Sequence, residues 1–220
     1  MMSPPRARFL PGDGSGESVR EHLVAVTERL LAEHGLEGLT TRRIAEAANV
    51  AHGLLYNHFA NKDDLILASL AARASTLVAE FEKACPRPGG GSLEGNLAAF
   101  AAALLKLQRA LLPLLASMIG KRELLRRFLA ELHSAEIGGP DRILRTLDDY
   151  LAAERQFGRV SGAGESHLVG ILLFAITQLH ALATYVREPD ATPAKAARQL
   201  RPFVSFLAAS LTTADANSPT

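Results

Sequence analysis

The feature that most constrains the fold is a short block, residues 39–67, in which two helix-forming segments flank a tight turn. The first segment reads T-T-R-R-I-A-E-A-A and the second reads H-G-L-L-Y-N-H-F. Asn49 lies between them, and its short side chain tolerates a positive φ better than most. The apolar positions that would fill the wedge between two crossing helices are Ile44, Ala45, Ala48, Val50, Leu55 and Phe59. The block therefore predicts a helix-turn-helix.

The polar side chains of this block suit a nucleic acid. A helix that enters the major groove places its N-terminal residues against base edges, while flanking donors contact phosphates. The residues expected at base edges are His52, Gly53, Leu54 and Asn57. The expected phosphate donors are Thr40, Thr41, Tyr56, His58 and Lys62. Arg42 faces outward at the start of its helix and is also counted among the expected DNA contacts, whereas Arg43 is expected to be a solvated charge.

This pattern resembles the TetR family of bacterial transcriptional repressors, with its signature T-x-x-I-A-x-x-A-x-V, then G-x-L-Y-x-H-F, then K-x-x-L. The matching residues are Thr41, Ile44, Ala45, Ala48, Val50, Gly53, Leu55, Tyr56, His58, Phe59, Lys62 and Leu65, within about residues 18–70. The resemblance implies a homodimer whose two heads bind a palindromic operator on double-stranded DNA. It also implies a divergent C-terminal domain that binds a small-molecule effector and thereby weakens DNA binding.

Two positions depart from the family's habit. The turn residue is usually glycine and is Asn49 here, and the serine that usually opens the recognition helix is replaced by Ala51. A serine at that position caps the helix, so its cap must come from elsewhere or be absent. The loss of such a cap typically costs about 1 kcal/mol, which is too little to overturn the resemblance.

Composition favours an all-α chain that acts inside the cell. Hydrophobic residues make up 48% of the sequence, much of it Ala and Leu, and only 5% is aromatic. Ala and Leu are among the best helix formers. The net charge of +1 requires any phosphate-binding surface to be a local patch. The single cysteine, Cys85, excludes an intramolecular disulfide, no signal peptide is visible, and both observations fit the cytoplasm.

Helix signals divide the chain into an arm, a head and a C-terminal domain. Residues 1–16 are expected to form a flexible arm, in which Arg6 and Arg8 either enter a minor groove or stay undocked. Residues 17–65 form the predicted DNA-binding head, linked through a helix over 62–84 to a helical ligand-binding and dimerisation domain over 66–220. Four local signals mark helix ends: Gly35 as a left-handed stop, Thr40 or Thr41 as a cap, Asn61 with Asp64, and Thr192 with Pro193.

The C-terminal domain is predicted to hold helices over residues 92–112, 113–119, 122–136, 140–157, 165–187 and 193–213, with a kink at Pro202. The helix over 165–187 is apolar on nearly every face, so it requires cover on all sides. The last helix carries Leu200, Phe203, Val204, Leu207 and Leu211 along one face. We expect these two helices to pair with their symmetry mates in a homodimer. A membrane span over 168–186 is disfavoured because Gln178 and His180 interrupt it.

An effector cavity is expected among the helices over 92–157. The candidate apolar lining residues are Phe100, Leu104, Leu107, Leu111, Leu115, Met118, Phe128, Leu132, Tyr150 and Phe174, and the candidate polar contacts are Gln108, His133 and Gln178. Ordinary core packing explains each apolar residue equally well. The scarcity of charge among them favours an apolar effector.

Charged residues elsewhere are expected to be solvated, and no enzyme motif stands out. The basic run Lys121, Arg122, Arg126 and Arg127 and the acidic residues Asp148, Asp149 and Glu154 are expected on exposed helix faces without specific partners. No metal-ligand spacing, nucleophile elbow or phosphate loop occurs, so neither a cofactor nor catalysis is expected. The leading prediction is a ligand-responsive repressor. The alternatives are an activator, or a small-molecule-binding protein or enzyme that keeps the head as a scaffold.

Overall fold

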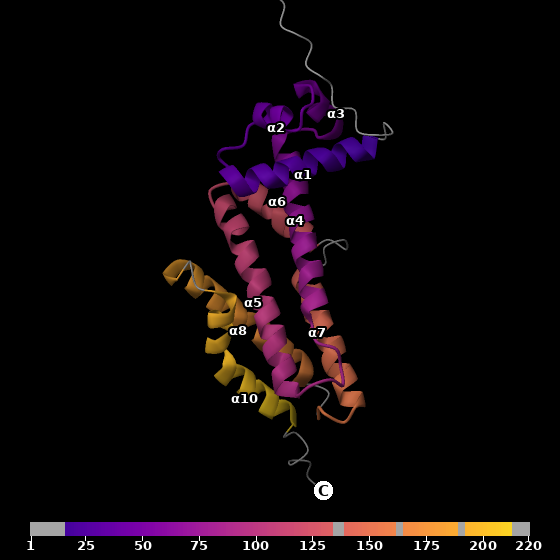
Figure 1. The fold of residues 1–220 in the computed structure, drawn as a ribbon, viewed down its shortest axis with the longest axis vertical. Helices are drawn as coiled ribbons and strands as arrows, with labels where there is room; N and C mark the ends of the chain where they lie inside the picture. The colour runs from indigo at the N-terminus through magenta and orange to yellow at the C-terminus, as the bar shows by residue number, and fades with distance from the viewer. Residues whose placement is uncertain (1–15, 134–138, 162–164, 189–191, 213–220) are drawn as a thin grey trace, which may run out of the picture. The chain divides into compact units, whose positions relative to one another are not determined.

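The computed structural model describes residues 16–133, 139–161, 165–188 and 192–212. All regular structure within these ranges is helical, which confirms the all-α prediction. The chain divides into two compact units, one of residues 1–74 and 115–131 and the other of residues 75–114 and 132–220. Helices α4 and α5 contribute to both units (Figure 1). The predicted domain boundary at residues 65 and 66 stays a prediction, and the predicted arm lies outside the described residues except for Gly16.

The first unit is the helix-turn-helix head. It contains α1 (Gly16–His34), α2 (Thr41–Ala47), the 3-10 helix η1 (His52–Leu54), α3 (Leu55–His58), the first half of α4 (Lys62–Ala84), the end of α5 (Leu93–Met118) and α6 (Arg122–Leu132). In Figure 1, α2 and α3 lie on the same side of α1. The predicted wedge residues Ile44, Ala48 and Leu55 are at most 2% exposed. Their burial against α1 fixes the angle between the two short helices of the motif.

Local signals set the ends of the head's helices as predicted. The Thr40 hydroxyl accepts a hydrogen bond from the Arg43 amide at 3.1 Å and so caps α2. Gly35 and Asn49 adopt φ values of +66° and +54° where the chain leaves α1 and α2. The Asn61 side chain accepts from the Asp64 amide at 2.9 Å at the start of α4. Ala51 precedes η1 without a side-chain cap, so the missing serine is not replaced.

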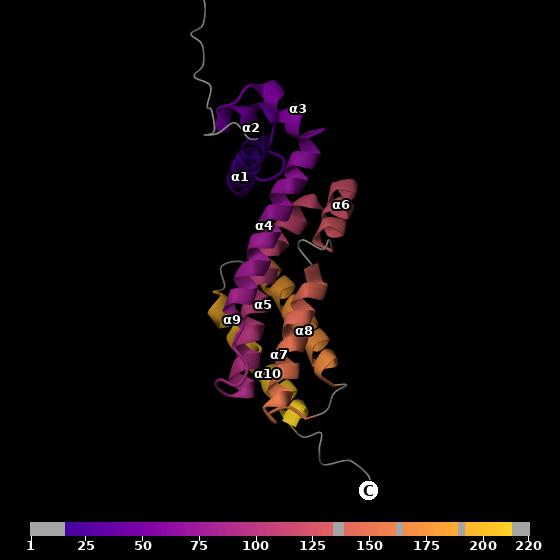
Figure 2. The same cartoon turned by 90° about the vertical axis from the view of Figure 1, so that its right-hand side faces the viewer.

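The second unit is a helical bundle. It contains the second half of α4, most of α5, α7 (Gly139–Gln156), α8 (Glu165–Arg187), α9 (Pro193–Gln199) and α10 (Arg201–Thr212). Helices α7 and α8 are in contact with each other, and Figure 2 shows them at the same level of the bundle. They approach each other at Gly170, where an added Cβ would make ordinary van der Waals contact with Asp148, Leu147 and Leu144. Phe100, Leu104 and Leu151 form part of the core, each at most 1% exposed.

Two predicted helix boundaries were wrong, and both involve proline. Helix α5 runs unbroken through Pro113, where separate helices over 92–112 and 113–119 were expected. Pro113 is exposed, while Leu112 and Met118 on either side of it are buried, so packing offsets the lost backbone hydrogen bond. The kinked last helix is instead two helices, α9 and α10, that meet at Leu200. Pro202 therefore lies in the first turn of α10, where a missing N–H costs little.

The last helix turns inward most of the face that was expected to pair with a second copy, so that prediction was wrong for four of its five residues. Leu200, Val204, Leu207 and Leu211 are buried within the chain itself. Phe203 and Phe206 are instead the large apolar side chains that α10 exposes.

By length and composition alone, the helices Leu93–Met118 and Ser166–Arg187 could each cross a membrane, but a buried core helix meets the same criterion.

Candidate nucleic-acid interface

The recognition segment, residues 52–58, presents most of its predicted contact residues outward. His52, Gly53, Tyr56 and Asn57 are exposed, and Leu54 and His58 are half-buried. Leu55 and Phe59 turn inward and are buried. This division follows from the short helical run, in which residues three and four apart share a face. The exposed face thus carries polar and small side chains on a buried apolar support.

The first residue of this segment is held by the helix before it. Nε2 of His52 lies 3.0 Å from Oγ1 of Thr41, within hydrogen-bond reach. The His52 ring also meets the ring of Tyr56 edge-on, with centroids 5.6 Å apart. The sequence spacing placed both residues at the interface but did not indicate this contact. The imidazole is therefore oriented in the absence of DNA.

Three of the predicted phosphate donors surround one shallow hollow of the head. Thr41, Tyr56 and Lys62 line it together with the apolar side chains of Leu55, Phe59 and Leu65. The ammonium group of Lys62 donates to the Leu39 carbonyl at 3.3 Å, which holds its stem against the head. Tyr56 is 52% exposed. A phosphate at this place would meet both a hydroxyl and an ammonium donor.

The remaining donors on α2 are positioned by short-range contacts. Thr40 accepts one hydrogen bond as the cap of α2, and a hydroxyl retains its own proton for donation. Arg42 is exposed and its Nε lies 2.9 Å from Oε1 of Glu46, a contact that raises the pKa of the guanidinium. Arg43 was expected to be simply solvated, but Nη1 donates to the Gly38 carbonyl at 2.6 Å. Arg43 therefore holds the loop before α2.

Gly53 has no structural reason to be glycine. A Cβ built at this position would meet no atom within 4 Å, and its φ lies outside the left-handed range. Glycine inside a helical turn is less favourable than alanine by about 0.5–1 kcal/mol. The fold would thus accept a side chain here without strain. The exposed backbone at Gly53 is therefore open to close approach by a partner.

Two residues that the sequence did not single out support the motif from α1. Nε2 of His22 lies 3.1 Å from the Ala48 carbonyl, at the end of α2. The guanidinium of Arg20 lies 5.1 Å from the centre of the Phe59 ring. Neither contact has a sequence signature, because each joins residues more than 25 positions apart.

The candidate effector residues are distributed over both units. Leu115, Met118 and Phe128 belong to the first unit, and the others belong to the second. Most are buried, but Leu111, Leu115, Phe174 and Gln178 are half-buried and His133 is exposed. A cavity of about 20 Å³ between α4 and α5 is lined by Leu107, together with Leu77, Glu80, Phe81, Ala84, Ala103 and Lys106. The candidate effector residues stay predictions.

Arg122, Arg126 and Asp149 are exposed as predicted, whereas Arg127, Asp148 and Glu154 make specific contacts. Arg127 donates to Oδ1 of Asp64 at 2.7 Å, which joins α6 to the first turn of α4 within the head. His167 contacts Asp148 at 2.7 Å. Glu154 was also expected on a solvated face, yet it is completely buried and paired. In the described part of the chain, no cluster of three or more His, Cys, Asp and Glu side chains is arranged to hold a metal ion.

Residues 23–69 match the family model described as bacterial regulatory proteins, tetR family. The head of the chain thus carries the helix-turn-helix domain of the TetR family. Similar curated relatives include the transcriptional repressor AcnR of Corynebacterium glutamicum, 39% identical over 64 residues that make up 28% of this chain and 34% of the relative. The transcriptional repressor KstR2 of Rhodococcus jostii is 41% identical over 66 residues, 30% of each chain. The chain thus matches about a third of the length of these relatives.

Outside the head, the chain resembles known proteins in fold alone. A putative TetR-family regulator from Mesorhizobium loti superposes with a TM-score of 0.67 over 88% of this chain and 96% of its own, at 18% identity. A putative transcriptional regulator from Pseudomonas aeruginosa gives 0.63 over 90% and 93%, at 22% identity. The C-terminal helices therefore share the fold of these two structures.

Proposed function

We propose that this protein is a TetR-family transcriptional repressor of the bacterial cytoplasm. As a homodimer it binds a palindromic operator, and it releases the DNA when a small apolar effector binds to its C-terminal domain. The observation that carries DNA binding is the exposed face of the recognition segment. This face combines a glycine that the fold does not require with the hydrogen-bonding side chains of His52, Tyr56 and Asn57.

The chemistry of this face suits a major groove flanked by phosphates. Asn57 can bond to adenine, and His52 offers one donor or acceptor to a base edge. Tyr56 and Lys62, beside Thr41, offer phosphate donors around one hollow. Because the net charge of the chain is only +1, these few donors must supply the attraction. Relatives that share this head are named transcriptional repressors, which favours repression over activation.

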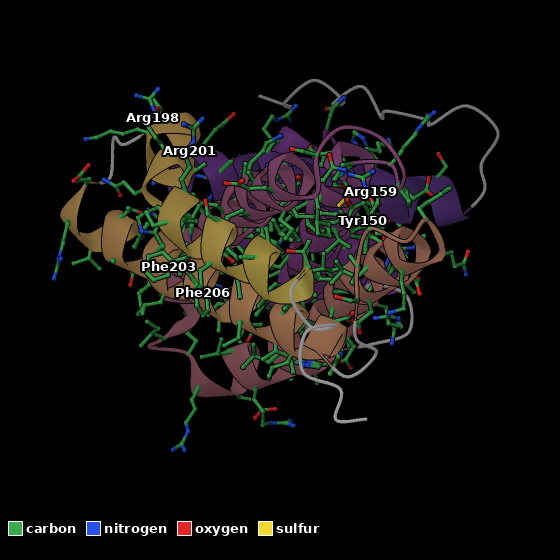
Figure 3. All side chains as sticks on the ribbon, turned by 90° about the horizontal axis from the view of Figure 1, so that it is seen from below. Tyr150, Arg159, Arg198, Arg201, Phe203 and Phe206 are labelled. Atoms are coloured by element: carbon green, nitrogen blue, oxygen red, sulfur yellow. The ribbon has the colours of Figure 1, made fainter. Side chains whose placement is uncertain are left out.

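An unpartnered apolar stripe on α8 supports the homodimer. The stripe consists of six exposed residues: Leu168, Leu172, Ala175, Leu179, Leu182 and Val186. They follow each other at alternating spacings of four and three residues. This is the spacing at which two helices pair along a common seam. Phe203 and Phe206 lie on one side of α10, with Arg201 at its start and Arg198 in the last turn of α9 (Figure 3). An apolar surface of this extent is rare on a monomer and fits a second copy of the chain.

Operator binding is tested with DNA from the intergenic region next to the gene. Fluorescence anisotropy at physiological salt compares the wild type with Tyr56→Ala and Lys62→Ala. Each variant is expected to bind at least tenfold more weakly, and the wild-type affinity is expected to fall steeply with salt because phosphate contacts release counterions. Arg29→Ala removes an exposed cation on α1 and serves as the matched control with unchanged affinity.

Equal binding by the wild type and both variants would contradict the proposed interface. It would favour a small-molecule-binding protein or enzyme that keeps the head as a scaffold. A reporter gene placed behind the bound fragment then separates repression from activation, because a repressor lowers its expression.

A further inference from the structure

The second unit contains a fully buried carboxylate whose partners do not belong to the candidate DNA interface. Glu154, near the end of α7, is 0% exposed. Its Oε1 accepts hydrogen bonds from the Tyr150 hydroxyl at 2.6 Å and from the Gly89 amide at 3.2 Å. Its Oε2 lies 3.3 Å from Nη1 of Arg159. A buried carboxylate is tolerated only with such compensation.

The same side chains hold the loop between α4 and α5, residues 85–92. Arg159 donates to the carbonyls of Gly90 and Gly91 at 3.3 and 2.8 Å. Asn96 donates to the Gly90 carbonyl at 2.7 Å and to the Tyr150 hydroxyl at 2.8 Å. Figure 3 shows Tyr150 and Arg159 close together at this end of the second unit. We name Asn96, Tyr150, Glu154 and Arg159 the loop clamp.

The loop cannot hold this conformation by itself. Gly89 and Gly91 adopt φ values of +80° and +57°, and glycine loses the most conformational freedom on ordering. A Cβ on Gly89 would lie 3.2 Å from the ring of Phe157, so the loop also packs against the end of α7. The residues that order the loop therefore come from α7, from the segment after it and from the start of α5. The clamp therefore supplies hydrogen bonds to Gly89, Gly90 and Gly91 of the loop.

A buried ion pair is a poor device for stability alone. Apolar residues of similar volume are often as stable in its place, whereas removal of one partner leaves an uncompensated charge. Such a cluster is suited to distinguishing two states of a segment, one held and one released. Here the segment is the loop that directly follows α4, and α4 begins in the head with Lys62 and Asp64.

We propose that the loop clamp is a latch on α4 that sets operator affinity. The inference rests on the proposed function, since α4 is the helix that continues from the head into the second unit. When the clamp is closed, it fixes the C-terminal end of α4, and its release weakens operator binding at the other end of the same helix. Tyr150 makes the latch responsive, because its ring packs against Phe100 at 4.8 Å between centroids. An apolar effector that displaces these rings withdraws the Tyr150 hydroxyl from Glu154.

The test uses Tyr150→Phe and Glu154→Gln in the full chain, with Asp149→Asn as a control on the same helix. Hydrogen exchange measured by mass spectrometry reports the amides of residues 85–92. Anisotropy with operator DNA reports the Kd, and a stoichiometric titration reports the fraction of protein that is active. Tyr150→Phe is the milder change, so it keeps the test valid if Glu154→Gln does not fold.

Both clamp variants are expected to exchange faster in the loop and to bind operator about five- to tenfold more weakly, a coupling of ordinary size. The active fraction stays unchanged, which separates this effect from partial unfolding. The control leaves both readouts at wild-type values. Fast loop exchange with a wild-type Kd would overturn the latch, as would unchanged exchange in both variants. A wild type that binds no operator would instead refute the proposed function, and the latch with it.

Discussion

Nε2 of His52 lies 3.0 Å from Oγ1 of Thr41, so the first residue of the recognition segment is bonded to the first residue of α2. The contact joins the two helices of the motif on their exposed side. It fixes the imidazole before DNA arrives and removes part of the entropic cost of ordering the side chain in the complex.

Thr41→Val should therefore weaken operator binding through His52. The substitution keeps the size of the side chain and removes its hydroxyl. We expect a three- to tenfold loss of affinity for Thr41→Val and about tenfold or more for His52→Ala, as for a lost base contact. Operator affinities measured by fluorescence anisotropy for the wild type, both single variants and the double variant give a double-mutant cycle. The double variant should lose less than the sum of the two single losses, whereas full additivity would show that each residue acts alone.

Gly53→Ala should separate DNA binding from stability. The added methyl group points into open space, and alanine favours the helical turn by about 0.5–1 kcal/mol. We expect an equal or higher melting temperature together with at least a tenfold loss of operator affinity. Gly35→Ala is the matched control, because its Cβ is equally unobstructed but its φ of +66° strains alanine. That variant should lose stability and keep its affinity once folded. Unchanged DNA binding by Gly53→Ala would refute close approach at this position.

The head could be predicted in detail because its signals are local. Asn49, Gly35 and the pair Asn61 and Asp64 act on backbone atoms within a few residues of themselves. Their effect on helix ends does not depend on the rest of the chain. The apolar wedge was predictable for the same reason, since its members fall within one short block.

The features that escaped prediction depend on distant residues. The α4–α5 loop and the end of α7 are held together by Glu154, which lies 65 positions from Gly89. Nothing near Glu154 in the sequence distinguishes it from the exposed Asp149. Pro113 was misjudged for a related reason, because the burial of its neighbours decides whether α5 continues. The tendency of a single residue to break or form a helix is overridden wherever side-chain packing contributes more free energy than one backbone hydrogen bond.

Leu179→Glu should disrupt the proposed homodimer. Leu179 lies in the middle of the α8 stripe and is 69% exposed in the single chain. Pairing with a second copy would bury the new carboxylate without a partner, which costs several kcal/mol. Light scattering after size exclusion should give a dimer for the wild type and a monomer for the variant. Ile119→Glu, at an equally exposed apolar residue outside the stripe, should stay dimeric. The reverse result would place the interface elsewhere.

Tyr150 should make the fold sensitive to alkaline pH. Burial, followed by its hydrogen bond to Glu154, raises the pKa of Tyr150 from 10.0 to about 12. The folded state thus keeps the phenol proton more tightly than the unfolded state does. The resulting stability is complete below pH 10 and is lost as the pH rises from 10 to 12. At pH 11 the loss amounts to about 1 kcal/mol.

Urea denaturation of the wild type and Tyr150→Phe between pH 8 and 11 measures this loss. The variant is less stable at pH 8, because it lacks the hydroxyl that Glu154 and Asn96 share. Since phenylalanine cannot ionise, the difference in unfolding free energy between the two proteins should shrink by about 1 kcal/mol toward pH 11. A difference that stays constant over this range would mean that the Tyr150 hydroxyl ionises as readily in the folded state as in the unfolded chain.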